Sequence, residues 1–234
     1  MRPRTGVIRV IGGDLRGRRL HAPRGEETRP TAARAREGLF GWLGPCVEDA
    51  QVLDVFAGTG ALGIEAASRG AAHVLFIERS GAALACLRKN LQELKLCERT
   101  RVVSGEVERA LRQLRAEGPR FDLILADPPY ADAIDCTRPA SAWAALLEPD
   151  GVLILERRTR GPGAAAEAAA LEGLALLGSR RYGQTAFDWY GHTTGEGMRG
   201  GQGSEATSPE PSPDGADAED EAPGGGEDDG EAGR

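Results

Sequence analysis

The chain has 234 residues, of which 29 are basic and 36 acidic, and its formal net charge is −7. This charge is unevenly placed, because residues 1–40 hold ten arginines against four acidic residues, whereas residues 192–234 hold twelve acidic residues against two arginines. No apolar run approaches the roughly 20 residues that cross a bilayer, and no apolar segment follows the basic N-terminus as it does in a secretory signal peptide. We therefore expect a cytoplasmic protein that does not span a membrane.

Cysteine and histidine do not form a recognisable metal-binding pattern. The four cysteines are widely spaced without a C-x-x-C pair, and the three histidines do not cluster with them. Neither a zinc site nor a disulfide framework is expected, which is typical of a reducing compartment.

Residues 1–45 are predicted to form a basic arm made of a hairpin and a helix. Val7–Ile11 and Arg18–His21 have the length of short strands, and the glycine-rich segment between them favours a turn. Thr31 is a suitable helix N-cap, and the helix that follows is expected to stop near Gly44-Pro45.

Residues 46–191 alternate between apolar runs of strand length and amphipathic helical stretches, which predicts a parallel sheet covered by helices on both faces. Two later runs are separated only by Gly183-Gln184, so the sheet is expected to finish with an antiparallel strand. The predicted strands are Val52–Ala57, Val74–Glu78, Arg101–Ser104, Phe121–Ala126, Val152–Glu156, Leu174–Tyr182 and Thr185–Tyr190, and the predicted helices are Ala61–Arg69, Ala82–Leu94, Val107–Glu117 and Ala140–Leu147.

Residues 192–234 contain Gly, Ser, Pro, Asp and Glu with almost no apolar residues. Such a segment cannot bury enough surface to offset its chain entropy, so we expect a disordered tail. It could serve only for solubility, or it could compete with RNA for the basic arm. The expected organisation is therefore one domain over residues 1–191, with its core at 46–191, followed by the tail.

A glycine-rich turn follows the first strand of the core, in the run Asp54-Val-Phe-Ala-Gly58-Thr-Gly60-Ala-Leu-Gly63. Glu78 ends the next strand about 20 residues later, where a carboxylate can accept hydrogen bonds from ribose. This much fits a nicotinamide dinucleotide and S-adenosylmethionine (SAM) equally well. Asp54 favours SAM, because a carboxylate inside the strand suits an ammonium group better than a pyrophosphate.

A second motif, Asp127-Pro128-Pro129-Tyr130, follows the fourth strand of the core. Asp127 and the Pro128 carbonyl can both accept hydrogen bonds from an exocyclic amine, which frees the nitrogen lone pair for attack on a methyl group. Proline has a fixed φ and no N–H, so the turn is stiff, and Tyr130 can stack on a base drawn out of its helix. No metal is required. The two motifs are 73 residues apart, a spacing that predicts neighbouring central strands.

With both motifs present, the chain resembles the SAM-dependent class I methyltransferases of amino groups and, more closely, the RsmD family of 16S rRNA guanine-N2 methyltransferases. The closer resemblance extends from Val7 to about Tyr190 and rests on two N-terminal blocks, Arg9-Val-Ile-Gly-Gly-Asp-Leu-Arg-Gly-Arg-Arg-Leu20 and Arg29-Pro-Thr-Ala-Ala-Arg-Ala-Arg-Glu-Gly-Leu-Phe-Gly-Trp-Leu43. The closing Arg181-Tyr-Gly-Gln-Thr-Ala186 also fits.

The resemblance implies an α/β, Rossmann-like fold with a mostly parallel seven-stranded sheet and an antiparallel last strand. It implies methyl transfer from SAM to N2 of guanine 966 in 16S rRNA, within an assembling small ribosomal subunit. It also implies that Asp54, Gly58 and Gly60 hold the methionine end of SAM, Glu78 the ribose and Glu106 the adenine amine. Asp127, Pro128, Pro129 and Tyr130 would be catalytic, and the enzyme is expected to be a monomer.

The arginine-rich arm is expected to contact RNA phosphates, because its net charge of +6 over 40 residues lies beside a base-modifying site. Arg34 and Arg36 could instead point inward, toward the cofactor. The open alternatives are a nicotinamide dehydrogenase, a methyltransferase of DNA adenine or protein glutamine, and a non-catalytic RNA-binding module. The arginines expected to bind RNA are Arg9, Arg16, Arg18, Arg19, Arg29, Arg34 and Arg36.

Overall fold

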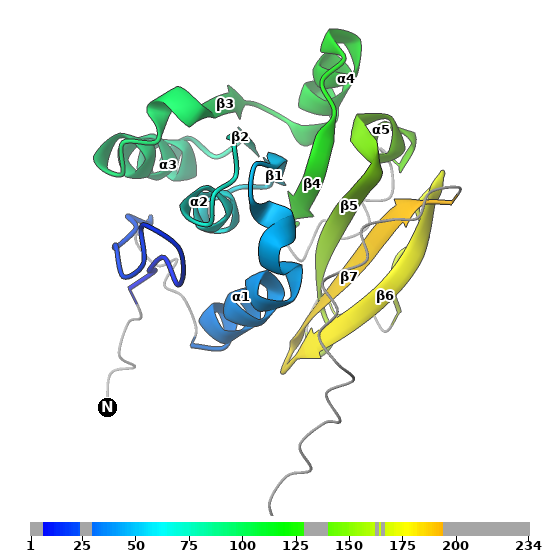
Figure 1. Cartoon of the computed structure of the whole chain (residues 1–234), viewed down its shortest axis with the longest axis horizontal. Coiled ribbons are helices and arrows are strands. Elements are labelled where there is room, and N and C mark those ends of the chain that lie inside the picture. The colour runs from blue at the N-terminus through cyan, green and yellow to red at the C-terminus, as the bar shows by residue number, and fades with distance from the viewer. Residues whose placement is uncertain (1–6, 24–29, 129–139, 162–163, 165–166, 194–234) are drawn as a thin grey trace, which may run out of the picture. The chain divides into compact units, whose positions relative to one another are not determined.

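The computed structural model describes residues 7–23, 30–128, 140–161, 164 and 167–193, all of which belong to one compact unit, Met1–Gly203. Strands and helices alternate along the chain, as the hydrophobic pattern predicts (Figure 1). The strands are β1 (Gln51–Val55), β2 (His73–Glu78), β3 (Thr100–Ser104), β4 (Phe121–Ala126), β5 (Leu147–Arg158), β6 (Leu174–Tyr182) and β7 (Thr185–His192). The α-helices are α1 (Pro30–Leu43), α2 (Ala61–Ser68), α3 (Gly81–Glu93), α4 (Val107–Glu117) and α5 (Ala140–Leu146), and short 3₁₀ turns cover Gly44–Val47 and Cys97–Arg99.

The strands form one seven-stranded sheet in the order β3-β2-β1-β4-β5-β7-β6. Neighbouring strands from β3 to β5 pair in parallel, whereas β7 runs antiparallel to both β5 and β6. The predicted Rossmann-like sheet with an antiparallel last strand is therefore confirmed. The chain order reverses between β1 and β4, and such a reversal is where open α/β sheets place their ligands.

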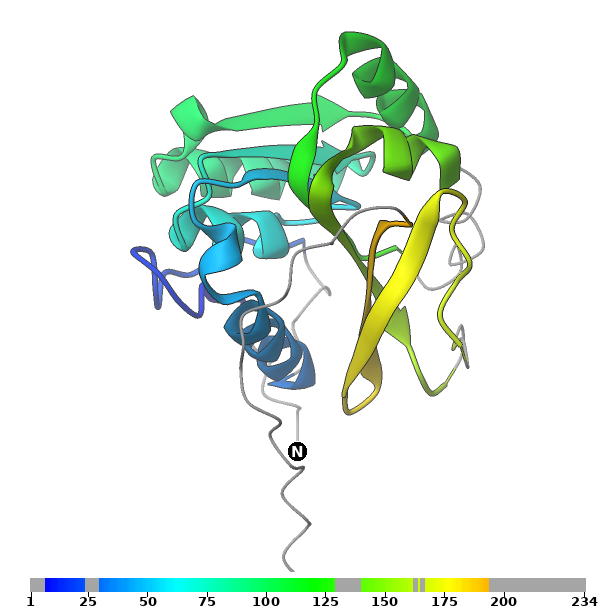
Figure 2. The ribbon, with the colours of Figure 1, turned by 45° about the vertical axis from the view of Figure 1, so that its right-hand side comes forward.

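Helices cover both faces of the sheet, as the two views of the ribbon show (Figures 1 and 2). Alternate residues of β1 point to opposite faces, so Val52 belongs to one buried cluster while Leu53 and Val55 belong to the other. The first face carries α1, α2, α3 and an N-terminal segment, defined here as residues 8–21. The second face carries α4 and α5.

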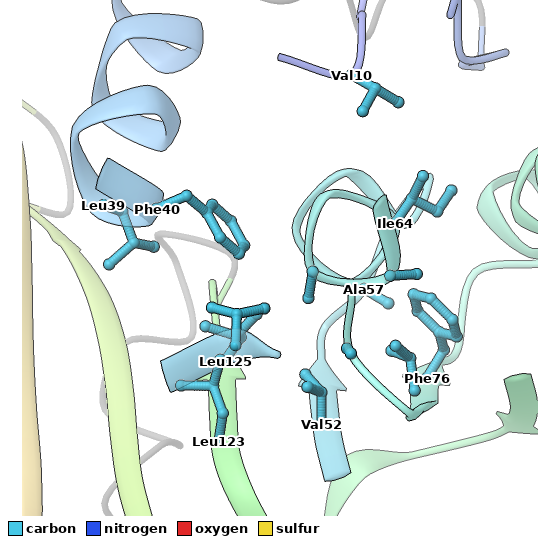
Figure 3. Packing of buried hydrophobic residues seen from close by; sticks show 14 of the residues in the cluster. Val10, Leu39, Phe40, Val52, Ala57, Ile64, Phe76, Leu123 and Leu125 are labelled. Carbon is cyan, nitrogen blue, oxygen red and sulfur yellow. The ribbon is translucent and has the colours of Figure 1, made fainter. Parts of the chain in front are cut away.

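The first face is packed from parts of the chain that are far apart in sequence. Helix α2 lies between Val10 of the N-terminal segment and the strands that carry Val52 and Leu125, while Phe40 of α1 packs beside α2 in the same cluster (Figure 3). Phe40 and Ile64 have no measurable exposure, and Val10 is 3% exposed. Burial of this kind stabilises by about 1.5–3 kcal/mol for each large apolar side chain, so it holds the N-terminal segment onto the core.

The predicted N-terminal hairpin is much reduced in the structure. The two expected strands share a single antiparallel bridge, between Arg9 and Arg19. Around this bridge the N–H groups of Val10 and Leu20 donate to the carbonyls of Arg18 and Ile8. The ladder ends there because Gly17, rather than Arg18, donates to the Val10 carbonyl, and the N–H groups of Ile11 and Gly12 donate to the carboxylate of Glu65 on α2. The prediction of two full strands was therefore wrong in extent, although the chain does reverse direction there.

Helix α1 begins at Pro30 and ends at Leu43, so the stop predicted near Gly44 is confirmed. Thr31, the predicted N-cap, is the second residue of the helix, so that prediction was wrong; the side chain of Thr31 lies outside the described residues. In the described part of the chain, no helix is both long enough and apolar enough to cross a membrane.

Candidate functional site

The two predicted motifs meet at the carboxyl ends of two central strands of the sheet. Strands β1 and β4 are parallel neighbours, with Val55 paired to Ala126, so the segments that follow the two strands leave the sheet side by side. The backbone N–H of Asp127 donates to the carbonyl of Val55 over 3.4 Å. The expectation that the motifs lie on neighbouring central strands is thereby confirmed.

The glycine loop has a backbone that ordinary residues adopt only with strain. The φ angles of Gly58 and Gly60 are 55° and 83°, in the left-handed region that favours glycine. A Cβ on Gly60 would lie 2.5 Å from Cδ1 of Leu87, whereas the nearest atom to a Cβ on Gly58 would be 4.0 Å away. The loop therefore packs tightly onto α3 at Gly60 and leaves open space on the Cβ side of the Gly58 backbone, which suits a closely bound ligand.

Carboxylates stabilise the loop from the strands beneath it. Glu78, at the end of β2, accepts from the Gly58 N–H over 2.7 Å through one oxygen and from the N–H groups of Arg79 and Ser80 through the other. Asp54 accepts from the Gly63 N–H over 2.8 Å, which ties β1 to the first turn of α2. Both carboxylates are thus part of the loop's own architecture, and a carboxylate still has lone pairs to offer to a ligand.

Four acidic residues lie near the carboxyl ends of neighbouring strands, on one face of the sheet. Glu78 ends β2, Asp54 lies in β1, Asp127 follows β4 and Glu156 lies near the end of β5. Side chains of a strand alternate between the two faces of the sheet, so residues on paired strands share a face when they are in register or two positions out of register. All four acidic residues meet this condition, and their side chains leave the sheet on the face that carries α1 and α2.

Desolvation makes three of these carboxylates, Asp54, Asp127 and Glu156, costly to ionise. Desolvation raises the pKa of Asp54 to about 7, with further increases from Asp127 and Glu78. Desolvation also raises the pKa of Asp127 to about 6, against the opposing effect of Arg158. The pKa of Glu156 is raised by desolvation and by Asp127, although Arg36, Arg158 and a hydrogen bond from Thr185 oppose the rise.

Such a row is suited to a ligand that brings positive charge. Buried carboxylates with raised pKa values gather at functional sites more often than elsewhere, and a cation placed among them would recover part of the desolvation cost. SAM carries both a sulfonium and an ammonium group, so the acidic row and the open backbone at Gly58 fit it. Among the described residues, no group of three His, Cys, Asp or Glu side chains could hold a metal ion.

The remaining predicted cofactor and catalytic residues are placed as follows. Glu106 precedes α4 and pairs with Arg79 at 3.3 Å, with 69% of its side chain exposed. Pro128 is buried directly after Asp127. Pro129 and Tyr130 lie outside the described residues.

The predicted RNA-binding arginines divide into two groups. Exposed positions are occupied by Arg9, Arg16, Arg18, Arg19 and Arg34, whereas Arg29 lies outside the described residues. Arg36 is only 6% exposed, and its guanidinium donates to the Arg9 carbonyl over 2.7 Å and lies 3.9 Å from Glu65. Its burial disagrees with a phosphate contact and agrees with an inward orientation, whereas a contact of Arg36 with the cofactor, which that alternative also expects, stays a prediction.

Sequence reasoning did not single out two side chains that bear on the site. Glu156 follows an apolar run along the sequence much as Glu78 does, and that parallel is a signal that could have identified it. Asn90 of α3 donates to the carbonyl of Thr59 inside the glycine loop. No sequence pattern marks this contact, because the two residues are 31 positions apart.

A hollow of about 340 Å³ lies at the other end of the strands, where β1, β2, β3 and β4 begin. It is lined by residues such as Gln51, His73 and Phe121 and contains none of the predicted site residues.

Comparison with known sequences gives consistent matches. The family described as Conserved hypothetical protein 95 matches residues 8–191. YlbH of Bacillus subtilis (strain 168) is 37% identical over 150 residues, which cover 64% of this chain and 82% of YlbH. Ribosomal RNA small subunit methyltransferase D of Escherichia coli (strain K12) is 46% identical over 126 residues, which cover 54% of this chain but only 62% of that relative.

Solved structures agree with the sequence matches. The structure of yhhF from Escherichia coli superposes with a TM-score of 0.65 at 34% identity and covers 80% of this chain and 98% of that one. The Thermus thermophilus 16S rRNA N2 G1207 methyltransferase (RsmC), in complex with AdoMet and guanosine, superposes with a TM-score of 0.62 at 25% identity and covers 81% of this chain and 50% of that one. The matched segment contains both motifs and the whole described sheet except its last residue, His192, and we conclude that the chain belongs to the Conserved hypothetical protein 95 family, which is the RsmD family.

Proposed function

We propose that this protein is a SAM-dependent rRNA methyltransferase that modifies the exocyclic N2 of guanine 966 in 16S rRNA, within an assembling small ribosomal subunit. The observation that carries the proposal is the adjacency of the glycine loop and the Asp127-Pro128 turn on β1 and β4, in a chain of the RsmD family. Relatives named for small-subunit rRNA methylation support the substrate class. The guanosine bound in the RsmC structure supports the base.

At the substrate side, Asp127 and the Pro128 carbonyl would accept the two N–H groups of the target amine. These hydrogen bonds favour a pyramidal nitrogen whose lone pair is free to attack. When bound, SAM supplies an electrophilic methyl group. Asp127, which is already ionised at neutral pH when its pKa is about 6, can take the proton that the nitrogen loses, or pass it to water. Pro129 would stiffen the turn, and Tyr130 would stack on the base.

At the cofactor side, the open backbone at Gly58 would receive the methionine end of SAM together with Gly60, while Asp54 supplies negative charge beneath it. Glu78 would hold the ribose through the lone pairs that its backbone contacts leave. Glu106 would reach the adenine amine by leaving its exposed ion pair with Arg79, which costs little because exposed pairs contribute at most about 1 kcal/mol.

RNA would be held by the exposed arginines of the N-terminal segment and of α1, namely Arg9, Arg16, Arg18, Arg19 and Arg34, joined by Arg29. Arg36 is left out of this set because it is buried. We further propose that residues 1–191 form the catalytic domain, that residues 192–234 are a disordered tail, and that the protein acts as a cytoplasmic monomer without a metal.

The test is methylation of small subunits that lack this modification, with labelled SAM, followed by mapping of the modified nucleotide. We expect label at N2 of one guanine. Asp127→Ala should lose nearly all transfer while keeping SAM binding, and Asp127→Asn should keep part of the activity because its amide oxygen still accepts one hydrogen bond. Full activity of Asp127→Ala would contradict the mechanism.

The same labelling assay with DNA or protein offered in place of subunits, together with binding measurements for nicotinamide dinucleotide and RNA, separates the alternatives. Label in DNA adenine or in a protein glutamine would point to the related amino-methyltransferases. Binding of nicotinamide dinucleotide in place of SAM would point to a dehydrogenase. RNA binding without any transfer would point to a non-catalytic module.

A further inference from the structure

Buried polar side chains of α2 and α3 hold the N-terminal segment. Glu65, which has no measurable exposure, accepts from the N–H groups of Ile11 and Gly12 over 2.7 and 2.8 Å. Ser68 accepts from the Leu15 N–H over 2.9 Å and donates to the Gly12 carbonyl over 2.5 Å. The segment that carries four of the five exposed arginines expected to bind RNA is thus attached to the helix that starts directly after the glycine loop.

Asn90 makes the same kind of attachment at the end of the segment, and it also contacts the loop itself. Its side chain is 1% exposed. Its carbonyl oxygen accepts from the His21 N–H over 2.7 Å. Its amide nitrogen donates to the His21 carbonyl over 3.1 Å and to the Thr59 carbonyl over 3.0 Å. A side-chain amide has two N–H donors, so one donor of Asn90 is used on the N-terminal segment and the other on the glycine loop.

The glycine loop is therefore held at two neighbouring residues by different parts of the chain. Glu78 fixes the Gly58 N–H from the sheet, and Asn90 fixes the Thr59 carbonyl from α3. Only the second contact is shared with the N-terminal segment. Because a buried amide left without a partner costs about 1–3 kcal/mol, a shift of His21 disturbs Asn90 and, through it, Thr59.

We propose that Asn90 is a positioning residue that couples the N-terminal segment to the glycine loop, so that binding of rRNA to the segment and binding of SAM to the loop strengthen each other. This inference rests on the proposed function, because it takes rRNA and SAM as the two ligands. Coupling between two sites is reciprocal, so RNA raises the affinity for SAM by the same factor by which SAM raises the affinity for RNA. The enzyme would then hold its cofactor most firmly when the substrate is in place.

Two matched variants separate coupling from simple loosening of the segment. Asn90→Asp keeps the size of the side chain and the acceptor for His21, but it replaces both donors with an oxygen that faces two carbonyl oxygens. Ser68→Ala removes two hydrogen bonds to the same segment and leaves Thr59 untouched. The dissociation constant of tritiated S-adenosylhomocysteine would be measured by equilibrium dialysis, with and without small ribosomal subunits that lack the methyl group.

For the unaltered protein we expect binding of S-adenosylhomocysteine to tighten by roughly fivefold or more when subunits are added, at the lower end of typical allosteric factors. Asn90→Asp should bind it about tenfold more weakly alone, as expected for the loss of about 1.4 kcal/mol, and should show no tightening with subunits. Ser68→Ala should keep the affinity of the unaltered protein for S-adenosylhomocysteine alone. Equal behaviour of the two variants, or an unchanged tightening in Asn90→Asp, would overturn the inference.

If Asn90→Asp does not fold, hydrogen exchange in the unaltered protein answers the same question. Amides of Gly58–Gly63 should exchange more slowly when subunits are added, and an unchanged rate would refute the coupling. Failure of the proposed function gives a different result, since the unaltered protein would then neither bind S-adenosylhomocysteine nor methylate subunits.

Discussion

Replacing Asp54 by Asn should stabilise the protein at neutral pH while weakening its binding of SAM. The carboxylate is 1% exposed, and its desolvation is the largest cause of the rise in pKa from 3.8 to about 7. Each unit of pKa corresponds to 1.36 kcal/mol, so ionising Asp54 in the folded state costs at most about 4 kcal/mol. Asn has nearly the same shape, and its carbonyl oxygen can still accept from the Gly63 N–H.

The sign of the pH dependence follows from the direction of the shift. The pKa is higher in the folded protein than in the unfolded chain, so the unaltered protein has its full stability from this group below about pH 4 and loses it as the pH rises to about 7. The amide introduced by Asp54→Asn does not titrate. The difference in unfolding free energy should therefore grow in favour of Asp54→Asn by about 1.4 kcal/mol per pH unit across that window and then level off.

Urea unfolding between pH 5.5 and 8.5, without cofactor, measures this difference. We expect Asp54→Asn to be more stable by about 2–4 kcal/mol at pH 8, because relaxation lowers the cost of a buried charge below its upper limit. The raised pKa values of Asp127 and Glu156 are common to both proteins and largely cancel. A stability difference that does not change with pH, or a variant that is less stable at pH 8, would refute the reasoning. Calorimetric titration with S-adenosylhomocysteine should show weaker binding to the variant.

The other predictions concern the N-terminal segment and α1. The double variant Arg16→Ala, Arg19→Ala should lower the slope of log K against log salt for rRNA binding by roughly 1.5, because each lost phosphate contact removes about 0.7–0.9. Arg36→Ala should leave that slope unchanged and reduce the unfolding free energy by about 2–4 kcal/mol, because it removes a buried charged partner. An unchanged unfolding free energy of Arg36→Ala would contradict the burial of this side chain. A Cβ on Gly13 would lie 1.7 Å from the Ser68 carbonyl, whereas one on Gly17 meets nothing within 4 Å, although both glycines have positive φ. Gly13→Ala should therefore destabilise by about 1–3 kcal/mol more than Gly17→Ala in thermal unfolding, and equal effects would show that the segment is not packed on α2.

Much of the fold could be predicted, because the signals are local. Every strand except β5 was placed within two residues at each end, since apolar runs bounded by turns define them. Strands β1 and β5 show where local signals fail. The prediction extended β1 to Ala57, but the chain leaves the ladder after Val55 and turns at Phe56, where φ is 61°. Strand β5 begins at Leu147, because pairing with Phe121 recruits residues that have no strand pattern of their own.

The N-terminal hairpin was overestimated for a related reason. Val7–Ile11 and Arg18–His21 have strand-like composition, but composition does not say which partner takes the backbone hydrogen bonds. Glu65, 54 positions from Ile11, supplies a buried carboxylate that accepts the N–H groups of Ile11 and Gly12, so the chain turns toward α2 after Val10 and the strand does not extend. A charge-assisted hydrogen bond is roughly twice as strong as a neutral one, which favours this outcome.

The amino-acid sequence alone decided the order of strands and helices. It also decided that acidic residues lie near the carboxyl ends of several strands and that special turns follow two of them. Hydrophobic period, glycine and proline act over a few residues, so they can be interpreted without knowing the rest of the molecule. Only the tertiary structure decided that β7 lies between β5 and β6, that Arg36 is buried while Arg34 is exposed, and that Asn90 joins His21 to Thr59. Burial and long-range hydrogen bonds depend on which distant segments pack together, and that information lies in the folded arrangement as a whole.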